Sequence, residues 1–287
     1  PPRPPAPPAS RPRAPAGAPR TGRAPQEMVM KAPPARHAPP LDRPGATDDA
    51  TLAVESLTVR FQGLAAISEV SLAMQRHEIF GLIGPNGAGK TTLVNCLTGF
   101  QKPTEGRVLV GDADASAWSP PEFRRHGIAR TFQAGRLFAE MSVLDNVEVT
   151  GVGLGQSRRA AQADARELLD WIGLGDKAGA PASALAYTDQ RRLGIARAMM
   201  LSPAFVLLDE PAAGMSDSEC EDLMEIVAAI PKAFVCGVLL IEHNMRVVMG
   251  ICDRIHVLDG GRTLAEDVPA AIQRHEEVMA AYLGMEA

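Results

Sequence analysis

The chain has 287 residues and a formal net charge of −5 at pH 7, and 46% of its residues are hydrophobic. This length favours one large domain or two small ones. The longest apolar run, residues 233–241, is too short to span a bilayer. Any role at a membrane is therefore predicted to depend on a partner.

The first fifty residues differ in composition from the rest of the chain. They hold 15 of the 24 prolines, and eight Lys or Arg against four Asp or Glu. They also lack aliphatic periodicity, so they cannot bury enough apolar surface to offset the entropy of folding. We predict a disordered Pro/Ala/Arg-rich tail over residues 1–50 and a folded part over residues 51–287. The basic tail could contact RNA or an anionic membrane surface, but an extension without a specific partner is favoured.

Charge and cysteine use both favour a cytosolic protein that does not bind nucleic acid. From Thr51 onward the chain holds 21 basic and 30 acidic residues, a balance of −9, which disfavours nucleic acid as a partner. Cys96, Cys220, Cys236 and Cys252 are far apart, form no C-x-x-C motif and lie in apolar contexts. Reduced, buried thiols are the economical interpretation.

Alternating apolar residues predict strands at the start of the folded part. Leu57, Val59 and Phe61 alternate with polar residues, and the pattern resumes over residues 67–72. An antiparallel layer is expected here, and it leads into the apolar run 79–83. Residues 107–111 predict one more short strand further along.

A glycine-rich segment, Gly-Pro-Asn-Gly-Ala-Gly-Lys-Thr-Thr over residues 84–92, follows the apolar run and opens into a predicted helix over residues 91–99. It fits G-x-x-x-x-G-K-[ST], in which backbone N–H groups surround a phosphate, the lysine reaches the β and γ phosphates and the threonine holds Mg²⁺. The helix N-terminus favours the same anion. An ordinary turn with a solvated lysine is disfavoured by the flanking strand and helix. The predicted nucleotide-binding residues are Gly84, Asn86, Gly87, Gly89, Lys90, Thr91 and Thr92.

A helical block is predicted over about residues 134–200. Residues 142–145, Ser-Val-Leu-Asp, have the capping form S-x-x-D. Residues 158–172 predict one amphipathic helix and residues 190–200 another. Beyond the block, residues 216–219 predict the capped start of a further helix, which connects two buried strands.

Polar residues end these two strands, which are predicted over residues 205–208 and 234–241. Asp209 and Glu210 follow the first strand, and His243 follows the second. Functional residues gather at the carboxyl ends of parallel strands. Asp209 is predicted to bind Mg²⁺ together with the phosphate-loop threonine, and Glu210 to be the general base for the attacking water. His243 is predicted to contact the γ phosphate or that water.

Five landmarks in one order resemble the ATP-binding cassette of ABC transporters, namely residues 84–91, Gln133, residues 185–190, Asp209-Glu210 and His243. The resemblance covers nearly everything from residue 51 onward and implies an α/β fold, a P-loop NTPase core with an antiparallel β subdomain and a helical subdomain. More specific strings are similar to the ATPase subunits of branched-chain amino-acid importers. These strings are Asn95 to Phe100, Arg130 to Gln133, Arg136 to Phe138, Asp209 to Gly214 and Ala281 to Gly284.

The resemblance also implies roles and partners. Phe61 would stack on adenine, Gln133 would sense Mg²⁺ and touch a membrane subunit, and His243 would be the switch histidine. Two cassettes would bind two ATP molecules head to tail, each between the phosphate loop of one chain and the signature of the other. The family further implies two membrane permease subunits, docked against residues 133–150, a substrate-binding protein acting indirectly, and a cytoplasmic location on the inner face of the cell membrane. The expected function is to hydrolyse ATP for an importer of branched-chain amino acids or related small polar solutes.

The signature segment departs from the family pattern L-[AS]-Y-G-Q-Q, because threonine and aspartate replace the glycine and the first glutamine. A carboxylate about 6 Å from a phosphate charge costs on the order of 3 kcal/mol at an effective dielectric constant of about 20. One interpretation is therefore an impaired site, which favours a heterodimer or a regulatory subunit that does not turn over. The other is that Thr188 or Asp189 caps the next helix, with Arg191 or Arg192 offsetting the charge. The predicted contacts to the ATP of the opposite subunit are Leu185, Ala186, Tyr187, Thr188, Asp189 and Gln190.

Overall fold

The computed structural model describes residues 50–131 and 137–283. The strands are β1 Thr51–Phe61, β2 Leu64–Gln75, β3 Ile79–Ile83, β4 Glu105–Val110, β5 Ala113–Asp114, β6 Ile128–Arg130, β7 Phe205–Asp209, β8 Gly237–Ile241, β9 Arg254–Asp259 and β10 Arg262–Asp267. The helices are α1 Lys90–Cys96, α2 Pro120–Arg125, α3 Val143–Gly153, α4 Arg158–Trp171, α5 Tyr187–Met199, α6 Asp217–Phe234, α7 Met245–Ile251, α8 Pro269–Ile272 and α9 Glu276–Leu283, with 3₁₀ turns at Gly175–Lys177 and Ala182–Ala184.

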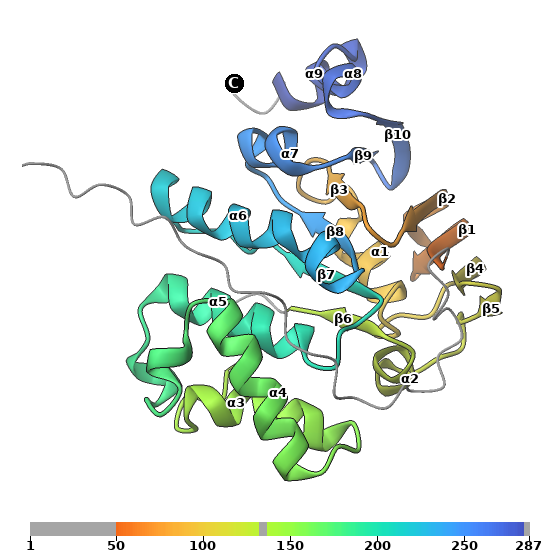
Figure 1. The fold of residues 1–287 in the computed structure, drawn as a ribbon. Coiled ribbons are helices and arrows are strands. Elements are labelled where there is room, and N and C mark those ends of the chain that lie inside the picture. The colour runs from red at the N-terminus through yellow and green to blue at the C-terminus, as the bar shows by residue number, and fades with distance from the viewer. Residues whose placement is uncertain (1–49, 132–136, 284–287) are drawn as a thin grey trace, which may run out of the picture.

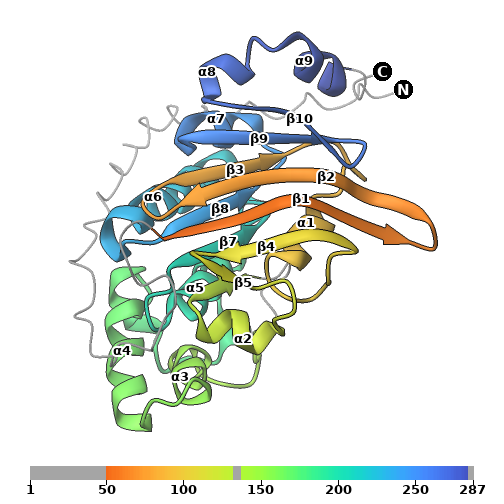
Figure 2. The ribbon, with the colours of Figure 1, turned by 90° about the vertical axis from the view of Figure 1, so that its right-hand side faces the viewer.

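Two sheets pack against each other, and Figure 2 shows β2, β1 and β4 of the antiparallel sheet in front of the second sheet. The antiparallel sheet has the order β2-β1-β4-β5, and the second has the order β10-β9-β3-β8-β7-β6. In the second sheet β9, β3, β8, β7 and β6 run parallel, and β10 pairs antiparallel with β9. The predicted antiparallel layer and parallel core are both confirmed.

The parallel strands are buried on both faces, as their continuous apolar sequences require. Phe80, Leu82 and Phe205 face a core shared with α1 and the antiparallel sheet. Their neighbours Ile79 and Val206 face a second core shared with the helices. The adjacent strands β3, β8 and β7 consequently end side by side, which places the residues after them at one edge of the sheet.

The helices α3, α4 and α5 lie together at the lower left of Figure 1. All three fall within residues 134–200, the range predicted for the helical block. The capping prediction is confirmed, since the Ser142 side chain accepts a hydrogen bond from the Asp145 N–H. The Trp171 ring in α4 packs edge-on against Phe234 of α6, with ring centroids 4.8 Å apart. This contact connects the helical block to the helix that covers the parallel sheet.

The strand predicted over residues 234–241 begins only at Gly237, because α6 continues through Pro231 to Phe234. Proline interrupts helix interiors through its missing N–H. Here Ile230, Pro231 and Phe234 are buried, and Val235 ends the helix in the left-handed conformation with φ 53°. Apolar burial against the sheet therefore extends the helix past a residue that usually stops one.

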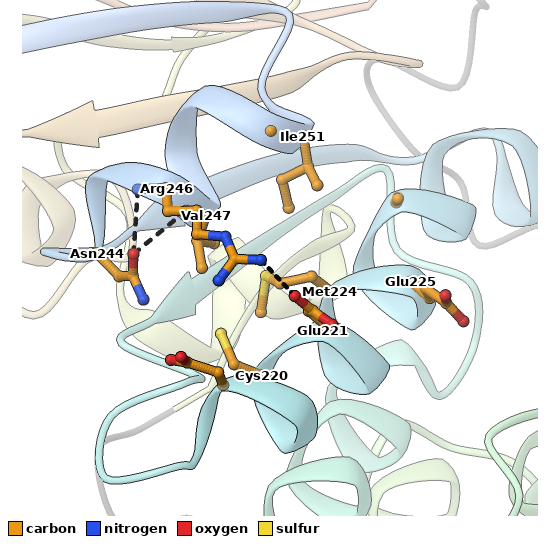
Figure 3. A pocket seen from close by; sticks show the side chains of 11 residues that line it. Cys220, Glu221, Met224, Glu225, Asn244, Arg246, Val247 and Ile251 are labelled. Carbon is orange, nitrogen blue, oxygen red and sulfur yellow. Dashed lines mark hydrogen bonds and ion pairs between the residues drawn. The ribbon is translucent and has the colours of Figure 1, made fainter. Parts of the chain in front are cut away.

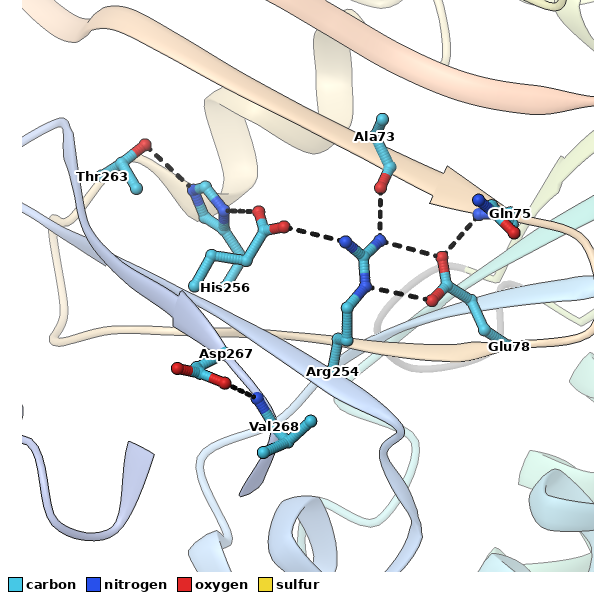
Figure 4. Close-up of polar contacts among 9 residues, drawn as sticks. Ala73, Gln75, Glu78, Arg254, His256, Thr263, Asp267 and Val268 are labelled. Atoms are coloured by element: carbon cyan, nitrogen blue, oxygen red, sulfur yellow. Dashed lines mark hydrogen bonds and ion pairs between the residues drawn. The ribbon is translucent and has the colours of Figure 1, made fainter. Parts of the chain in front are cut away.

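Polar contacts fasten the β9-β10 hairpin to the rest of the sheet, as Figure 4 shows. The Arg254 guanidinium donates to Glu78 from Nε at 3.2 Å and to Glu266 from Nη1 at 3.0 Å. The fully buried His256 ring lies with Nδ1 2.7 Å from Glu266 Oε2 and Nε2 3.2 Å from the Thr263 hydroxyl. This network holds in place the hairpin from which α8 and α9 follow.

No helix within residues 50–131 and 137–283 is both long and apolar enough to cross a membrane.

All four cysteines are free and buried, as predicted. Burial raises the pKa of the Cys96 and Cys252 thiols to about 12. Because a raised pKa favours the neutral thiol in the folded state, each contributes stability below the ordinary thiol pKa of 9.0 that is lost as the pH rises through about 12. We expect iodoacetamide at pH 8 to leave both thiols unmodified in the folded chain and to label them in urea, as read by peptide mass spectrometry. Rapid labelling of folded Cys96 would contradict this burial.

Candidate active site

The phosphate loop connects the fully buried strand β3 to α1, as predicted. Gly84 has φ 149° and Gly89 has φ 99°, backbone conformations that residues with a Cβ rarely adopt. A Cβ on Gly84 would lie 2.1 Å from the Leu258 carbonyl oxygen, and one on Gly89 would lie 2.5 Å from Cγ2 of Ile67. Both glycines are thus required by backbone conformation and by close packing.

Lys90 lies inside the curve of the loop. Its ammonium donates to the Gly84 carbonyl at 2.6 Å and to the Pro85 carbonyl at 3.0 Å, and the residue is 8% exposed. Burial lowers the pKa of Lys90, and the nearby Glu210 and Asp209 carboxylates oppose that shift. A bound phosphate group would replace these carbonyls as the hydrogen-bond acceptor and would balance the charge of the buried Lys90 ammonium.

One cavity of about 220 Å³ brings the separate predictions together. Glu210 and His243 line it beside the phosphate loop, and the His243 Nε2 lies 2.6 Å from the Glu210 Oε1. The lining residues are Ala66, Asn86, Gly87, Ala88, Gly89, Lys90, Thr91, Thr92, Glu210 and His243. Gly84 is not among them, although its carbonyl holds Lys90. The candidate base and the candidate switch histidine therefore share this cavity with residues of the glycine-rich loop.

Glu210 follows β7 in an uncommon backbone conformation with φ 47°. Its N–H donates to the Ile241 carbonyl at 2.9 Å, which fixes the end of β7 against β8. Such conformations persist only where the surrounding structure imposes them, and they cluster at functional sites. The side chain is thereby directed to His243 rather than along the strand.

Two further charged residues were not predicted as site residues. Arg130 at the end of β6 binds the Asp209 Oδ2 at 2.8 Å, and the buried Glu242 accepts from the Ala212 N–H at 2.9 Å and the His243 N–H at 3.2 Å. Burial raises the pKa of Glu242. The sequence signal that could have found both is a charged residue at the carboxyl end of a short apolar strand. Thr91 and Asp209 are the oxygen donors that could hold a divalent cation here.

The signature segment, residues 185–190, spans the start of α5, which begins at Tyr187 and not at Gln190. The N-cap is Ala186 and no side chain caps the helix, so the capping interpretation is wrong. Thr188 donates to Glu219 of α6 at 2.7 Å. Leu185, at the other end of the segment, is buried, and its carbonyl accepts from the Gln190 side chain at 3.0 Å.

The Asp189 carboxylate is paired inside the helical block. It accepts from the Lys177 ammonium, and Arg192 lies 3.8 Å away. Only 12% of the Asp189 side chain is exposed. The charge that motivated an impaired site is therefore largely offset by Lys177, which the sequence analysis did not name, and by Arg192, which it did.

Replacing Lys177 by methionine should uncover this charge. Because Lys177 is 42% exposed, we expect a loss of about 1 kcal/mol in the free energy of unfolding, less than for a fully buried pair. The double variant Lys177→Met with Asp189→Asn should recover most of that loss. Urea denaturation measures both, and equal midpoints for the single variant and the unmodified chain would remove the stabilising role of the pair.

Besides Gly84, neither Asp209 nor Phe61 lines the cavity. Phe61 ends β1 with 49% of its surface exposed and is not among the lining residues, although Ala66 of the neighbouring strand is. Its stacking on adenine remains a prediction. Gln133 lies outside the described residues.

A separate cavity of about 340 Å³ lies between α6 and α7, and Figure 3 shows it. Cys220, Met224, Val247 and Ile251 give it apolar walls, while Glu221 and Arg246 form an ion pair at its side. None of its lining residues belongs to the phosphate loop. It is distinct from the candidate active site.

A buried parallel strand, a glycine-rich loop that encloses a lysine, and an acid at the end of a nearby parallel strand together define a P-loop NTPase. Residues 67–213 match the ABC transporter family, and residues 262–285 match a family described as branched-chain amino acid ATP-binding cassette transporter. The chain belongs to the ABC transporter family and is an ATP-binding, ABC-type ATPase. The predicted family and fold class are confirmed, and no comparison favours an impaired subunit.

The matches to curated relatives extend over almost the whole length of each relative. The chain is 45% identical to the high-affinity branched-chain amino acid transport ATP-binding protein LivG of Escherichia coli (strain K12) and 40% identical to BraF of Pseudomonas aeruginosa, in each case over 81% of this chain and 97% of the relative. The crystal structure of the ADP conformation of MJ1267, an ATP-binding cassette of an ABC transporter, has a TM-score of 0.75 and 28% identity. That match covers 82% of this chain and 99% of MJ1267.

Proposed function

We propose that this ATPase drives the import of branched-chain amino acids. The observation that carries the proposal is the 45% identity to LivG, a branched-chain amino acid transport protein, over 97% of its length. The match of residues 262–285 to a branched-chain amino acid family supports the same substrate class.

In the proposed mechanism, Lys90 and the N–H groups of the phosphate loop bind and orient the β and γ phosphates of ATP. Glu210 accepts a proton from the water that attacks the γ phosphate, and the bond to the β-γ bridging oxygen breaks as the new bond forms. His243 lies 2.6 Å from Glu210, so it can orient that carboxylate and the water. The Glu242 carboxylate accepts hydrogen bonds from the backbone N–H groups of His243 and Ala212. These bonds fix the segment after β8 relative to the segment after β7.

We also propose Mg²⁺ as the metal, held by Thr91 and Asp209. Mg²⁺ prefers oxygen donors and is usually bound by one or two carboxylates together with substrate phosphates. The donor set fits, because the Thr91 hydroxyl and the Asp209 carboxylate both offer oxygen donors. Bound Mg²⁺ would neutralise part of the negative charge on the phosphates.

We propose that the second cassette is a different chain, so that the transporter holds a heterodimer. With Asp189 paired to Lys177, this expectation rests on Thr188, whose side chain stands where the family has glycine. Exchanging Thr188 for glycine should raise the turnover of a homodimer by about tenfold, equivalent to about 1.4 kcal/mol in the barrier. The matched variant Asp189→Asn should change it much less. A homodimer that already turns over as fast as the Thr188→Gly variant would argue against asymmetry.

A groove beside the helical block is proposed to receive the permease subunits. It has a volume of about 440 Å³, and Phe100, Phe138 and Val149 on its lining are 53%, 50% and 38% exposed. Exposed apolar residues gathered at a hollow are typical of protein contacts. Docking here would place the chain on the inner face of the cell membrane.

Residues 1–50 are proposed as a tail outside the cassette of residues 51–287.

Co-expression with the permeases tests this docking. The unmodified chain should sediment with membranes only when the permeases are present, and Phe138→Asp should reduce the sedimented fraction. Val268→Asp is the matched control, because Val268 is similarly exposed at 48% but lies outside the groove. Equal sedimentation of both variants would reject the groove as the docking site.

The transport function is tested in cells of the source organism that lack this chain. Uptake of radiolabelled leucine, isoleucine and valine should fall, and the unmodified chain should restore it while Glu210→Gln should not. Unchanged uptake of all three would reject the proposed substrate class but not the ATPase activity.

A further inference from the structure

Arg130 joins three elements of the nucleotide site at one guanidinium. Its Nη2 donates to the Asp209 Oδ2 at 2.8 Å, and its Nη1 donates to the Asn95 Oδ1 at 2.7 Å. Arg130 ends β6, Asp209 ends β7, and Asn95 lies in α1, the helix that follows the phosphate loop. A planar guanidinium fixes the direction of each bond, so the position of Asp209 is tied to that of α1.

The next residue holds the backbone of the same aspartate. The Thr131 N–H donates to the Leu207 carbonyl at 2.9 Å, and the Thr131 hydroxyl accepts from the Asp209 N–H at 3.2 Å. Asp209 is therefore held through its side chain by Arg130 and through its main chain by Thr131. Both contacts come from the end of one short strand.

The contact is well shielded from water. The Arg130 and Asp209 side chains are 9% and 14% exposed, so solvent screens their attraction less than that of a surface pair. An ionised carboxylate has two oxygens and about four acceptor positions. Oδ2 can consequently remain on Arg130 while Oδ1 meets a metal ion.

We propose that Arg130 is a positioning residue, which holds Asp209 through Oδ2 so that Oδ1 can bind the Mg²⁺ of bound Mg-ATP. The inference rests on the metal role proposed above for Asp209. Groups that orient a ligating side chain typically contribute about 10- to 100-fold to metal affinity. The opposite arrangement, in which Arg130 competes with Mg²⁺ for Asp209, predicts the opposite sign.

The experiment measures the binding of a fluorescent ATP analogue to the full chain, first in EDTA and then during titration with Mg²⁺. Arg130→Met should raise the Mg²⁺ concentration at half-saturation by about 10- to 100-fold. Binding of the analogue in EDTA should stay unchanged, because Arg130 is not placed on the phosphates. A mere packing defect would weaken binding in both conditions.

Two milder variants keep the test informative if Arg130→Met does not fold. Arg130→Lys retains the charge but lacks the fork, and Asn95→Ala removes one tether without touching Asp209. Both should shift the Mg²⁺ requirement in the same direction by less than Arg130→Met. Arg107→Met is the control, since it breaks an exposed pair with Glu55 in the antiparallel sheet and should shift nothing.

Asp209→Asn separates the two levels of the proposal. If Asp209→Asn raises the Mg²⁺ requirement but the Arg130 variants leave it unchanged or lower it, the positioning role of Arg130 is overturned and the metal role of Asp209 stands. If Asp209→Asn also has no effect, the metal role is wrong and the inference about Arg130 falls with it.

Discussion

Replacing Lys90 by alanine is expected to lower the affinity for Mg-ATP by at least about 100-fold. Lys90 is directed into the loop and donates hydrogen bonds to two loop carbonyls. In the ATP complex, phosphate oxygens would accept these hydrogen bonds instead. Hydrogen bonds to charged groups contribute about 1.5–3 kcal/mol each, and about 2.7 kcal/mol corresponds to 100-fold in affinity. Equilibrium dialysis with labelled ATP and Mg²⁺ measures the loss.

A surface lysine is the matched control for this variant. Lys102 donates to the Ala117 carbonyl at 2.7 Å and lies outside the cavity, so Lys102→Ala should keep the affinity for Mg-ATP. Circular dichroism of Lys90→Ala establishes that the loop variant is folded. An affinity within a few-fold of the unmodified chain would contradict the phosphate-binding role of Lys90.

Replacing Glu210 by glutamine is expected to lower ATP turnover by about 10²- to 10⁴-fold while ATP binding is retained, because general bases contribute about this factor. Glutamine keeps the size of the side chain and can still bond to His243, but it cannot accept the proton of the attacking water. The retained ATP should hold two cassettes in a closed dimer. Steady-state phosphate release and size-exclusion chromatography with ATP measure the two effects.

Glu221→Gln is the control for the loss of a carboxylate. Glu221 lies on α6, where its exposed side chain pairs with Arg246, and the substitution should leave turnover unchanged. Turnover of Glu210→Gln within tenfold of the unmodified chain would reject Glu210 as the base. Equal loss of ATP binding in the Lys90 and Glu210 variants would contradict their separate roles.

The site residues that were predictable from sequence are those whose place in the fold is determined by a local motif or by the end of a buried strand. The loop of residues 84–92 lies between a buried strand and a helix, and its glycines carry the backbone conformations that the motif requires. Glu210 and His243 were predictable because they closely follow buried strands, and adjacent parallel strands bring their carboxyl ends to one edge. The capped starts of α3 and α6 have local hydrogen bonds that a four-residue pattern encodes.

What was missed depends on contacts between residues distant in sequence. Arg130 meets Asp209 across 79 positions, and a sequence pattern does not state which partner a charged residue takes. The same holds for Lys177, which lies in a 3₁₀ turn and offsets the charge of Asp189. The start of β8 was misplaced at residue 234, because the apolar run does not show that burial of Ile230 and Phe234 favours continuation of α6.

The most direct test of the account is ATP-driven uptake of leucine by the purified transporter in lipid vesicles. This chain is reconstituted with the proposed partner cassette, permeases and substrate-binding protein. Mg-ATP is placed on the side of the cassettes and radiolabelled leucine on the other side. We predict leucine accumulation that requires ATP and is abolished by Glu210→Gln, with no accumulation of lysine. Accumulation of leucine to the same level with Glu210→Gln, or hydrolysis that never moves leucine, would contradict the proposed function.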